Sequence, residues 1–220
     1  MTTKVSCTMR LIARIFFISF VLCITSTTQL TKPLQTDADT LVQQLRDLPT
    51  PLPVSPRSDG SIPPEEQRRR QLYEEILRLG PNGVLGLSRA LHADDVHLRK
   101  NAALALSVLA GSWYDPSWPR LDIRRALPAL VVALHDSEPN VRGWSAQAIG
   151  EIGADAKGAV PELITLLSNP DEGSRNSACI ALRGIGPAAK PALPALNKSL
   201  SDPSKDVRQF AALAIKSIER

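Results

Sequence analysis

Cysteine is nearly absent from this chain, which has three among its 220 residues. Two of them, Cys7 and Cys23, lie in an N-terminal stretch that looks like an export signal, so a processed chain would keep only Cys179. A single thiol excludes an internal disulfide. Cys179 also falls where two in-phase positions have alanine, and free cysteine is often a buried core residue. We therefore expect Cys179 to be packed in the core.

Aromatic residues and histidines are also few, and the motifs of common catalytic sites are missing. The chain has 4% aromatic residues and three histidines. No glycine-rich loop ends in Lys-Ser or Lys-Thr, and no nucleophile motif occurs. A catalytic triad can be assembled from distant residues, so this absence weighs only a little against an enzyme. We expect a non-catalytic protein with no cofactor.

Residues 1–29 have the order of features that is typical of a secretory signal. Lys4, Arg10 and Arg14 make a basic start, and an apolar run from Ile15 to Ile24 follows. This run is shorter than the roughly 20 helical residues that cross a bilayer. We predict an exported protein, periplasmic or secreted. The alternative is an uncleaved N-terminal anchor, which would then be the only contact with a membrane.

The charges are nearly balanced once this segment is set aside. The full chain has a formal net charge of +4, from 26 basic and 22 acidic side chains. Three of the basic residues and none of the acidic ones lie in the N-terminal segment, so the rest has a net charge of +1. The sequence therefore gives little support to a general nucleic-acid-binding role.

A repeat of 33 residues organises the last third of the chain. Such a period is typical of stacked structural units, because each unit has an apolar face that only its neighbours can cover. Seven positions recur in phase three times: Pro128, Pro161 and Pro194; Leu130, Leu163 and Leu196; Leu134, Leu167 and Leu200; Arg142, Arg175 and Arg208; Ala146, Cys179 and Ala212; Ile149, Leu182 and Ile215; Ile152, Ile185 and Ile218.

Each repeat encodes two helices separated by a turn. Pro128 stands where the first turn of a helix tolerates proline, and apolar residues at helical spacing follow as far as Leu134. The residues from Asp136 to Pro139 break this helix. A second helix runs from Val141 to Ile152, and Gly150 and Gly153 mark its end. No alternating run is long enough for a strand, so the sequence predicts an all-α fold.

This pattern resembles the HEAT-like repeats of bacterial proteins, the type first named in bilin lyases. The resemblance rests on Pro-x-Leu-x-x-x-Leu, an acidic turn, and Val-Arg-x-x-Ala-Ala-x-Ala-Leu-Gly-x-Ile-Gly, which corresponds to Val141 to Gly153 here. It implies a right-handed α-solenoid of about three and a half to four helix hairpins. Ankyrin repeats share the period, but their Thr-Pro-Leu-His signature is absent.

The rest of the chain divides into a linker and a repeat domain. Residues 30–64 are a proline-rich linker with one short helix, Asp37 to Leu48, which either docks on the repeats or simply tethers them; we favour a mobile tether with weak docking. The repeat domain covers residues 65–220, with a cap helix at 65–80. Repeats follow at 81–111, 124–156, 157–189 and 190–220, and an aromatic insertion, 112–123, separates the first two.

Two surfaces are candidates for binding another protein. The insertion holds Trp113, Tyr114 and Trp118, and large aromatic side chains are good interface anchors. Alternatively, these residues fold back over the wider gap between repeats. The second candidate is the exposed side of the second helices, which lines the concave face in the resembled solenoids. Its residues are Trp144, Gln147, Ile180 and Phe210, for which packing between repeats is the alternative role.

Arginine recurs near the start of every second helix. A ladder of positive charge suggests phosphate binding, but the resemblance implies that these arginines pair with acidic groups and carbonyls between adjacent repeats. We favour this structural role, because the planar guanidinium suits forked hydrogen bonding. The residues are Arg99, Arg142, Arg175 and Arg208, which follow Asp94, Asp136, Asn169 and Asp202.

A metal site is not expected from the three histidines. His92 and His135 occupy equivalent positions, and His97 lies nearby. A di-iron hydroxylase family with HEAT-like repeats uses several His-Glu pairs, whereas the corresponding pairs here are His-Ala and His-Asp. This donor set is too small for such a site.

Together these patterns favour an exported, monomeric scaffold that binds another protein on a preordered surface. The resemblance also implies an enzyme-class alternative, a bilin-lyase-like or chromophore-handling subunit. That family usually works in the cytoplasm, so the export signal argues against it. A third interpretation, a HEAT-like DNA glycosylase, needs a basic groove, and the net charge of +1 disfavours it. We expect no nucleic-acid partner.

Overall fold

The computed structural model describes residues 32–49, 62–111 and 117–220, with side chains from Ala38 onward. The chain splits into two compact units, Met1–Asp37 and Ala38–Arg220. Of the first unit, only the beginning of helix α2 (Lys32–Gln43) is described. The predicted signal and the proline-rich residues 50–61 lie outside the described residues. The second unit contains the repeats.

All regular structure in the described ranges is helical, which confirms the predicted all-α class. None of the helices described is both long and apolar enough to cross a membrane. After α2 the elements are η1 (Gln44–Asp47), α3 (Pro64–Leu79), α4 (Pro81–Ala90), α5 (Val96–Ala110), η2 (Arg124–Ala126), α6 (Leu127–Ala133), α7 (Pro139–Ile152), η3 (Gly153–Ala159), α8 (Val160–Leu166), α9 (Glu172–Ile185), η4 (Gly186–Ala192), α10 (Leu193–Ser199) and α11 (Lys205–Ile218), where η denotes a 3-10 helix.

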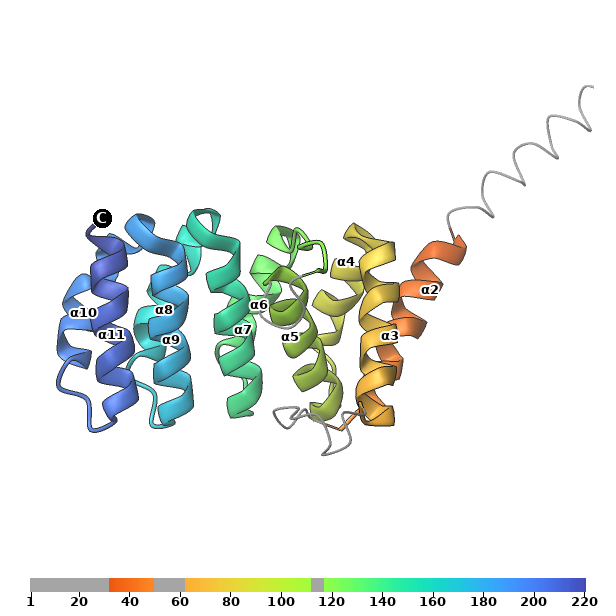
Figure 1. Cartoon of the computed structure of the whole chain (residues 1–220), viewed down its shortest axis with the longest axis horizontal. Coiled ribbons are helices and arrows are strands. Elements are labelled where there is room, and N and C mark those ends of the chain that lie inside the picture. The colour runs from red at the N-terminus through yellow and green to blue at the C-terminus, as the bar shows by residue number, and fades with distance from the viewer. Residues whose placement is uncertain (1–31, 50–61, 112–116) are drawn as a thin grey trace, which may run out of the picture. The chain divides into compact units, whose positions relative to one another are not determined.

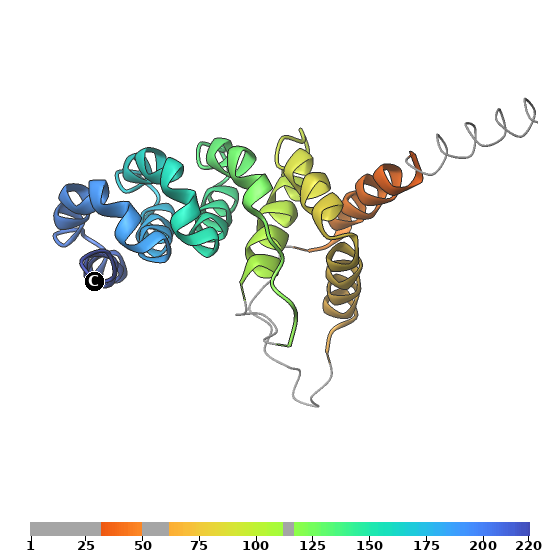
Figure 2. The same cartoon turned by 90° about the horizontal axis from the view of Figure 1, so that it is seen from above.

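The helices from α4 onward form consecutive hairpins, α4–α5, α6–α7, α8–α9 and α10–α11. The second helix of each hairpin packs on the second helix of the next, from α5 through α7 and α9 to α11. Figures 1 and 2 show the resulting row, in which the first helices form one layer and the second helices the other. The second unit is therefore an α-solenoid of stacked helix hairpins, as the repeat pattern predicts.

Proline and glycine set the boundaries of these helices. Pro128 lies in the first turn of α6, where its missing N–H has no intrahelical partner to lose. Gly153 and Gly186 end α7 and α9 with φ of 73° and 65°, a conformation that side chains with a Cβ disfavour. A 3-10 turn then leads into the next first helix. Pro161 and Pro194 repeat the arrangement of Pro128 in α8 and α10.

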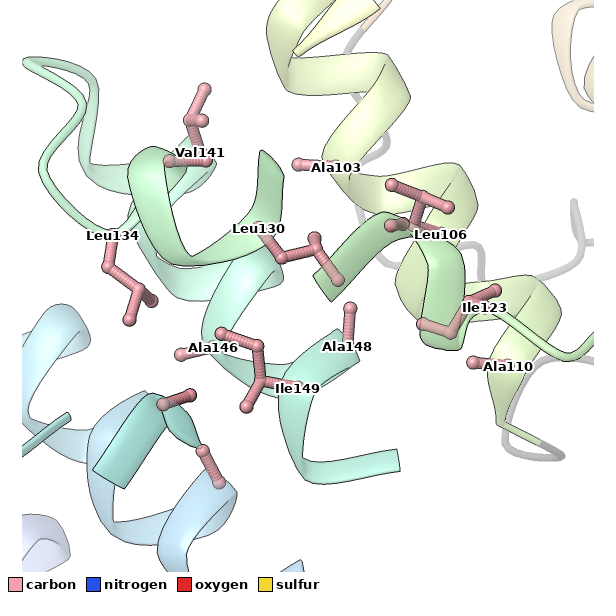
Figure 3. Close-up of a cluster of buried hydrophobic side chains, with 14 of the residues drawn as sticks. Ala103, Leu106, Ala110, Ile123, Leu130, Leu134, Val141, Ala146, Ala148 and Ile149 are labelled. Carbon is pink, nitrogen blue, oxygen red and sulfur yellow. The ribbon is translucent and has the colours of Figure 1, made fainter. Parts of the chain in front are cut away.

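The core consists of the in-phase aliphatic residues and small residues between the helices. Leu130, Ala146 and Ile149 are fully buried, and Figure 3 shows them in one cluster of buried hydrophobic side chains. Cys179, in phase with Ala146, is also fully buried, and burial raises its pKa to about 12. The interpretation of Cys179 as a packed core residue is confirmed. Ala212, at the same position in α11, is exposed because no described helix packs on that side.

The short linker helix docks on the repeats, which was the alternative to the tether with weak docking that we favoured. Asn101 on α5 donates hydrogen bonds from Nδ2 to the carbonyl oxygens of Leu45 and Leu48, at 2.8 and 3.0 Å. On α4, Gly86 leaves room for this segment, since a Cβ there would lie 3.2 Å from Val42. The segment docks because it buries its whole apolar stripe: Leu41, Val42, Leu45 and Leu48.

Candidate functional site

The exposed side of α5, α7, α9 and α11, which we call the second-helix face, has two adjoining hollows between α7 and α9. The smaller, about 180 Å³, lies over Gly143, Asp171 and Ser177. The larger, about 760 Å³, lies over the C-terminal halves of the two helices. Trp144 and Gln147 line both hollows. The larger volume falls in the roughly 300–1,000 Å³ range of ligand pockets.

Two glycines form the floor of the larger hollow. A Cβ added to Gly184 would lie only 2.4 Å from the carbonyl oxygen of Gly150, so α7 and α9 meet backbone to backbone at this point. A Cβ on Gly150 would lie 3.0 Å from the Cα of Ala181. The prediction that Gly150 marks the end of the helix is wrong, because Gly153 ends α7 and Gly150 permits the close approach. At the floor of the larger hollow, the backbone of Gly150 and Gly184 is therefore not covered by side chains of their own.

Three of the residues predicted on this face come together at the larger hollow. Trp144 and Gln147 project from α7 and Ile180 from α9, and each is partly exposed. Gln147 accepts a hydrogen bond from the Ser107 hydroxyl on α5, at 3.5 Å. Phe210, on α11, is partly buried and lines neither hollow. The candidate surface is thus narrower than predicted and centres on α7 and α9.

The aromatic insertion is described only in part, since Trp113 and Tyr114 lie outside the described residues. Trp118 is partly buried and packs edge to face on the ring of Tyr73 from α3, with ring centroids 6.2 Å apart. Tyr73 itself is almost fully buried, and this burial raises its pKa. One side of Trp118 is therefore used inside the protein, as the fold-back alternative expects. A partner contact by Trp118 stays a prediction.

The arginine ladder joins consecutive repeats. Arg99 donates from Nη1 to the carbonyl oxygens of Ala93 and Asp94 in its own turn, both at 2.9 Å. Its Nε donates to Asp136 Oδ2 in the next repeat at 2.7 Å. Arg175 repeats this arrangement, with Nε 2.8 Å from Asp202 Oδ2, and its guanidinium holds the pKa of that carboxyl below the usual range. These side chains have structural contacts that leave little capacity for phosphate.

Among the described residues, two arginines of the ladder lack the close carboxylate partner that Arg99 and Arg175 have. These are Arg142 and Arg208. Asn169 stands where the neighbouring repeats have Asp136 and Asp202, so Arg142 donates from Nε to the Ser174 hydroxyl instead, at 2.9 Å. Its Nη2 lies 3.8 Å from Asp171 Oδ2, too far for a hydrogen bond. At the C-terminal end, Arg208 donates only to the carbonyl oxygens of its own turn, Asp202 and Pro203.

The charges around the larger hollow are partly unpaired. Arg120, Glu151 and Arg183 line it, and Arg183 and Glu151 are exposed. Neither the Arg183 guanidinium nor the Glu151 carboxylate has a hydrogen bond or ion pair with a described residue. On the other side of Trp144, hydrogen bonds from Ser174 lower the pKa of Asp171, which keeps this carboxyl ionised in the smaller hollow.

The histidines show no arrangement for a metal. Within residues 32–49, 62–111 and 117–220, no group of three or more His, Cys, Asp or Glu side chains could hold a metal ion. His135 Nε2 lies 2.8 Å from Glu162 Oε2, and both side chains are largely exposed. The residues gathered on the second-helix face suit apolar contact and hydrogen bonding to a bound partner.

Comparison with known proteins links this architecture to a repeat family. The family model for HEAT repeats matches residues 87–183 and 127–216. No curated protein matches the chain. Among solved structures, the complex of CpcE and CpcF of phycocyanin lyase from Nostoc sp. PCC7120 gives a TM-score of 0.60 at 19% identity, covering 81% of this chain and 98% of that one.

Engineered repeat proteins are similar in the same way. Computationally designed armadillo repeat proteins for modular peptide recognition give a TM-score of 0.53 at 22% identity, covering 84% of this chain and 90% of theirs. Another engineered protein gives 0.55 at 23% identity, with coverage of 83% and 79%. At these identities the likeness shows a common fold.

Proposed function

Because the chain belongs to the HEAT-repeat family, we propose that it is a non-catalytic scaffold that binds another protein through the second-helix face of α7 and α9. The observation that carries this proposal is the pair of hollows that share Trp144 and Gln147. A large, partly exposed aromatic side chain beside a hollow is the kind of residue that anchors an interface. The repeat fold itself fits protein binding.

Close packing and hydrogen bonds between repeats support a surface that is ordered before a partner binds. Gly150 and Gly184 hold α7 and α9 in backbone contact, and the Arg175–Asp202 pair ties the next hairpin to this one. Because association costs free energy for every side chain or loop that must be ordered, a preordered surface binds more tightly than a flexible one of equal area. The fold likeness to designed proteins for peptide recognition agrees with such a surface.

We also propose that the protein is exported. The support is the basic start and apolar run of residues 1–24, which are typical of a secretory signal. Expression of the full chain with a C-terminal tag, followed by fractionation and mass determination, tests this. A processed protein outside the cytoplasm is expected, and an unprocessed cytoplasmic protein would contradict it.

Affinity capture from the native host tests the scaffold proposal. Wild-type protein and a Trp144→Ala variant are compared, each checked for folding by circular dichroism, and captured proteins are purified and titrated back. We expect a partner that binds the wild type and loses at least about tenfold in affinity with Trp144→Ala, since anchor residues cost about 2 kcal/mol or more when truncated. Ile180→Ser is a second variant of the same surface, in case Trp144→Ala does not fold.

Val132→Ala is the matched control. Val132 is an exposed apolar residue, 57% accessible, on the first helix α6. We expect it to bind the partner like the wild type. If Val132→Ala abolishes binding while Trp144→Ala and Ile180→Ser do not, the partner uses the layer of first helices and the proposed surface is wrong.

A lyase-like subunit is the second candidate function. The observation in its favour is the fold likeness to the CpcE and CpcF complex of phycocyanin lyase, at 19% identity. The predicted export signal and the missing catalytic motifs argue for the scaffold. Co-expression with a bilin-producing pathway separates the two: a pigment that co-purifies with the protein and absorbs visible light would support the lyase-like subunit.

A further inference from the structure

From the charges and shape of the larger hollow, we propose that the partner segment bound there is an extended acidic peptide. An apolar side chain of this segment contacts Trp144 and Ile180, and a carboxylate next to it pairs with Arg183. This inference rests on the proposed scaffold function and names the chemistry of its partner. It rests on the glycine floor, the apolar side wall and the positive rim of the hollow.

The floor suits a peptide backbone. Other second helices have a side chain at the position of Gly150, namely Arg183 in α9 and Lys216 in α11. A Cβ on Gly150 or Gly184 would lie against the neighbouring helix, so both glycines permit the close contact of α7 and α9. No side chain projects from Gly150 over the hollow, which leaves room there for a short stretch of bound peptide backbone.

The side wall supplies apolar contact on one side. Trp144 and Ile180 both line the hollow and both remain partly exposed in the absence of a partner. An aliphatic side chain laid against them would remove apolar surface from water on both sides, at roughly 25 cal/mol per Å². Gln147, beside Trp144, has an amide group that can donate a hydrogen bond to a peptide carbonyl.

The rim favours a negative partner over a positive one. Arg183 lines the hollow, and its guanidinium has no hydrogen bond or ion pair with a described residue, whereas Arg120, which also lines it, already has an interaction within the protein. Glu151 is the one carboxylate among the described residues that line this hollow. Lys216, at the position of Arg183 in the neighbouring helix α11, is exposed and adds positive charge to the same face. A guanidinium can bind a carboxylate through two parallel hydrogen bonds, which makes Arg183 the best-suited recognition group.

Titration with short labelled peptides tests the proposal. Three peptides share one leucine and differ in the two residues after it, which are glutamates, glutamines or lysines. Fluorescence anisotropy at low salt measures their affinity for the full chain. We expect the glutamate peptide to bind at least about tenfold more tightly than the glutamine peptide, and its advantage to shrink with added salt. Arg183→Glu should remove this preference and favour the lysine peptide.

Arg78→Glu is the control, because Arg78 is a highly exposed arginine on α3, away from the hollow. It should leave the peptide preference unchanged. The indole N–H signal of Trp144, assigned in an NMR spectrum with Trp144→Phe, should shift when the glutamate peptide binds to the wild type. Equal binding of all three peptides, a preference for lysine, or a glutamate preference that survives Arg183→Glu would overturn the inference.

These outcomes differ from a failure of the scaffold proposal. If a captured partner depends on Trp144 but not on Arg183, and no peptide shows a charge preference, the surface is right and the acidic segment is wrong. If no partner depends on Trp144 or Ile180, the scaffold proposal itself fails, and the peptide preference then describes a binding site without the proposed role.

Discussion

The α7–α9 interface and the α3–α5 interface fill the space between two helices in opposite ways. Between α7 and α9, the contacts of Gly150 with Gly184 and Ala181 bring two second helices into backbone contact. Between α3 and α5, the position in phase with Ala146 is Tyr73, and η1 packs against α5 beside it. Small residues close one interface, and inserted residues fill the other.

The difference shows which interface leaves exposed surface that a partner can bind. At the α3–α5 interface, Tyr73, Trp118 and the docked η1 fill the space with the protein's own residues. At the α7–α9 interface, the bare backbone leaves a hollow of about 760 Å³ open to other molecules. The regular part of the repeat array is therefore the better candidate for binding, although the irregular part holds most of the aromatic residues.

Removal of Tyr73 should have the largest effect. Tyr73→Ala would leave a cavity beside Trp118 and cost about 4 kcal/mol in the free energy of unfolding, as large-to-small changes at buried aromatics do. Urea unfolding followed by circular dichroism measures this. Leu85→Ala, at a residue 38% exposed on α4, is the control and should cost less than half as much. A loss of under about 1 kcal/mol for Tyr73→Ala would mean that the α3–α5 interface repacks freely.

A methyl group between α7 and α9 should be the next most damaging change. In Gly184→Ala the new Cβ would meet the Gly150 carbonyl at 2.4 Å, which forces the helices apart. We expect a loss of about 3 kcal/mol despite the higher helix propensity of alanine. Gly158→Ala in η3, where a Cβ meets nothing within 4 Å, should be neutral or slightly stabilising. If both variants unfold at the same temperature, the close contact between Gly150 and Gly184 does not limit how α7 and α9 pack.

Loss of one ladder carboxylate should have a smaller, pH-dependent effect. Asp202→Asn keeps the oxygen that accepts a hydrogen bond from the Ser204 N–H but removes the negative charge that faces Arg175. We expect the free energy of unfolding to fall by about 2 kcal/mol at pH 7. Arg175 lowers the pKa of Asp202 in the folded protein, so this stabilisation is complete above the unfolded pKa of about 4 and is lost as the pH falls through the lowered value. Thermal melts across this range should therefore show the two proteins converge in acid.

Asp206→Asn is the control for this pair, since Asp206 is an exposed residue of the same helix, α11. Asp206 lies in the first turn of α11, where an exposed carboxylate contributes about 0.5 kcal/mol, so its replacement should lower the melting temperature much less than Asp202→Asn does. A constant gap between wild type and Asp202→Asn down to strongly acidic pH would show that the loss comes from packing and not from the ion pair.

Release of the docked segment should have the smallest effect on global stability. Asn101→Ala removes two hydrogen bonds to the carbonyl oxygens of Leu45 and Leu48, but it also removes a buried Oδ1 that has no partner, so we expect a net loss of about 1 kcal/mol. Hydrogen exchange should rise in residues 38–48 and stay unchanged in α9 and α11. Equal exchange in α2 and η1 of the two proteins would mean that the apolar stripe alone holds the segment.

Residues with short-range effects could be predicted from the sequence. Pro128 in the first turn of α6 and Gly153 at the end of α7 act within a few residues, so their roles follow from position alone. The pairing of Arg99 with Asp136 was implied by the resemblance to HEAT-like repeats, in which such arginines pair with acidic groups of the adjacent turn. The period also predicts that Trp144, Gln147 and Ile180 share one face, and all three line the larger hollow.

Contacts that break the period could not be predicted. Gly150 and Gly184 are 34 residues apart, one more than the repeat, because helices that cross bring together positions that are not equivalent. The only signal in the sequence was glycine inside a helix. The docking of α2 and η1 was only the second choice, because the prolines after them suggest a linker and nothing nearby in the sequence indicates that Gly86 and Asn101 contact them.

The sequence by itself determined the helices, their order and the register in which they stack, because periodic burial of aliphatic residues and the backbone limits of proline and glycine act locally. Only the tertiary structure decided which interface closes on bare backbone and which is filled with inserted residues. That outcome depends on how closely two particular helices can approach, and the approach is set by steric contact between residues that no periodic pattern connects.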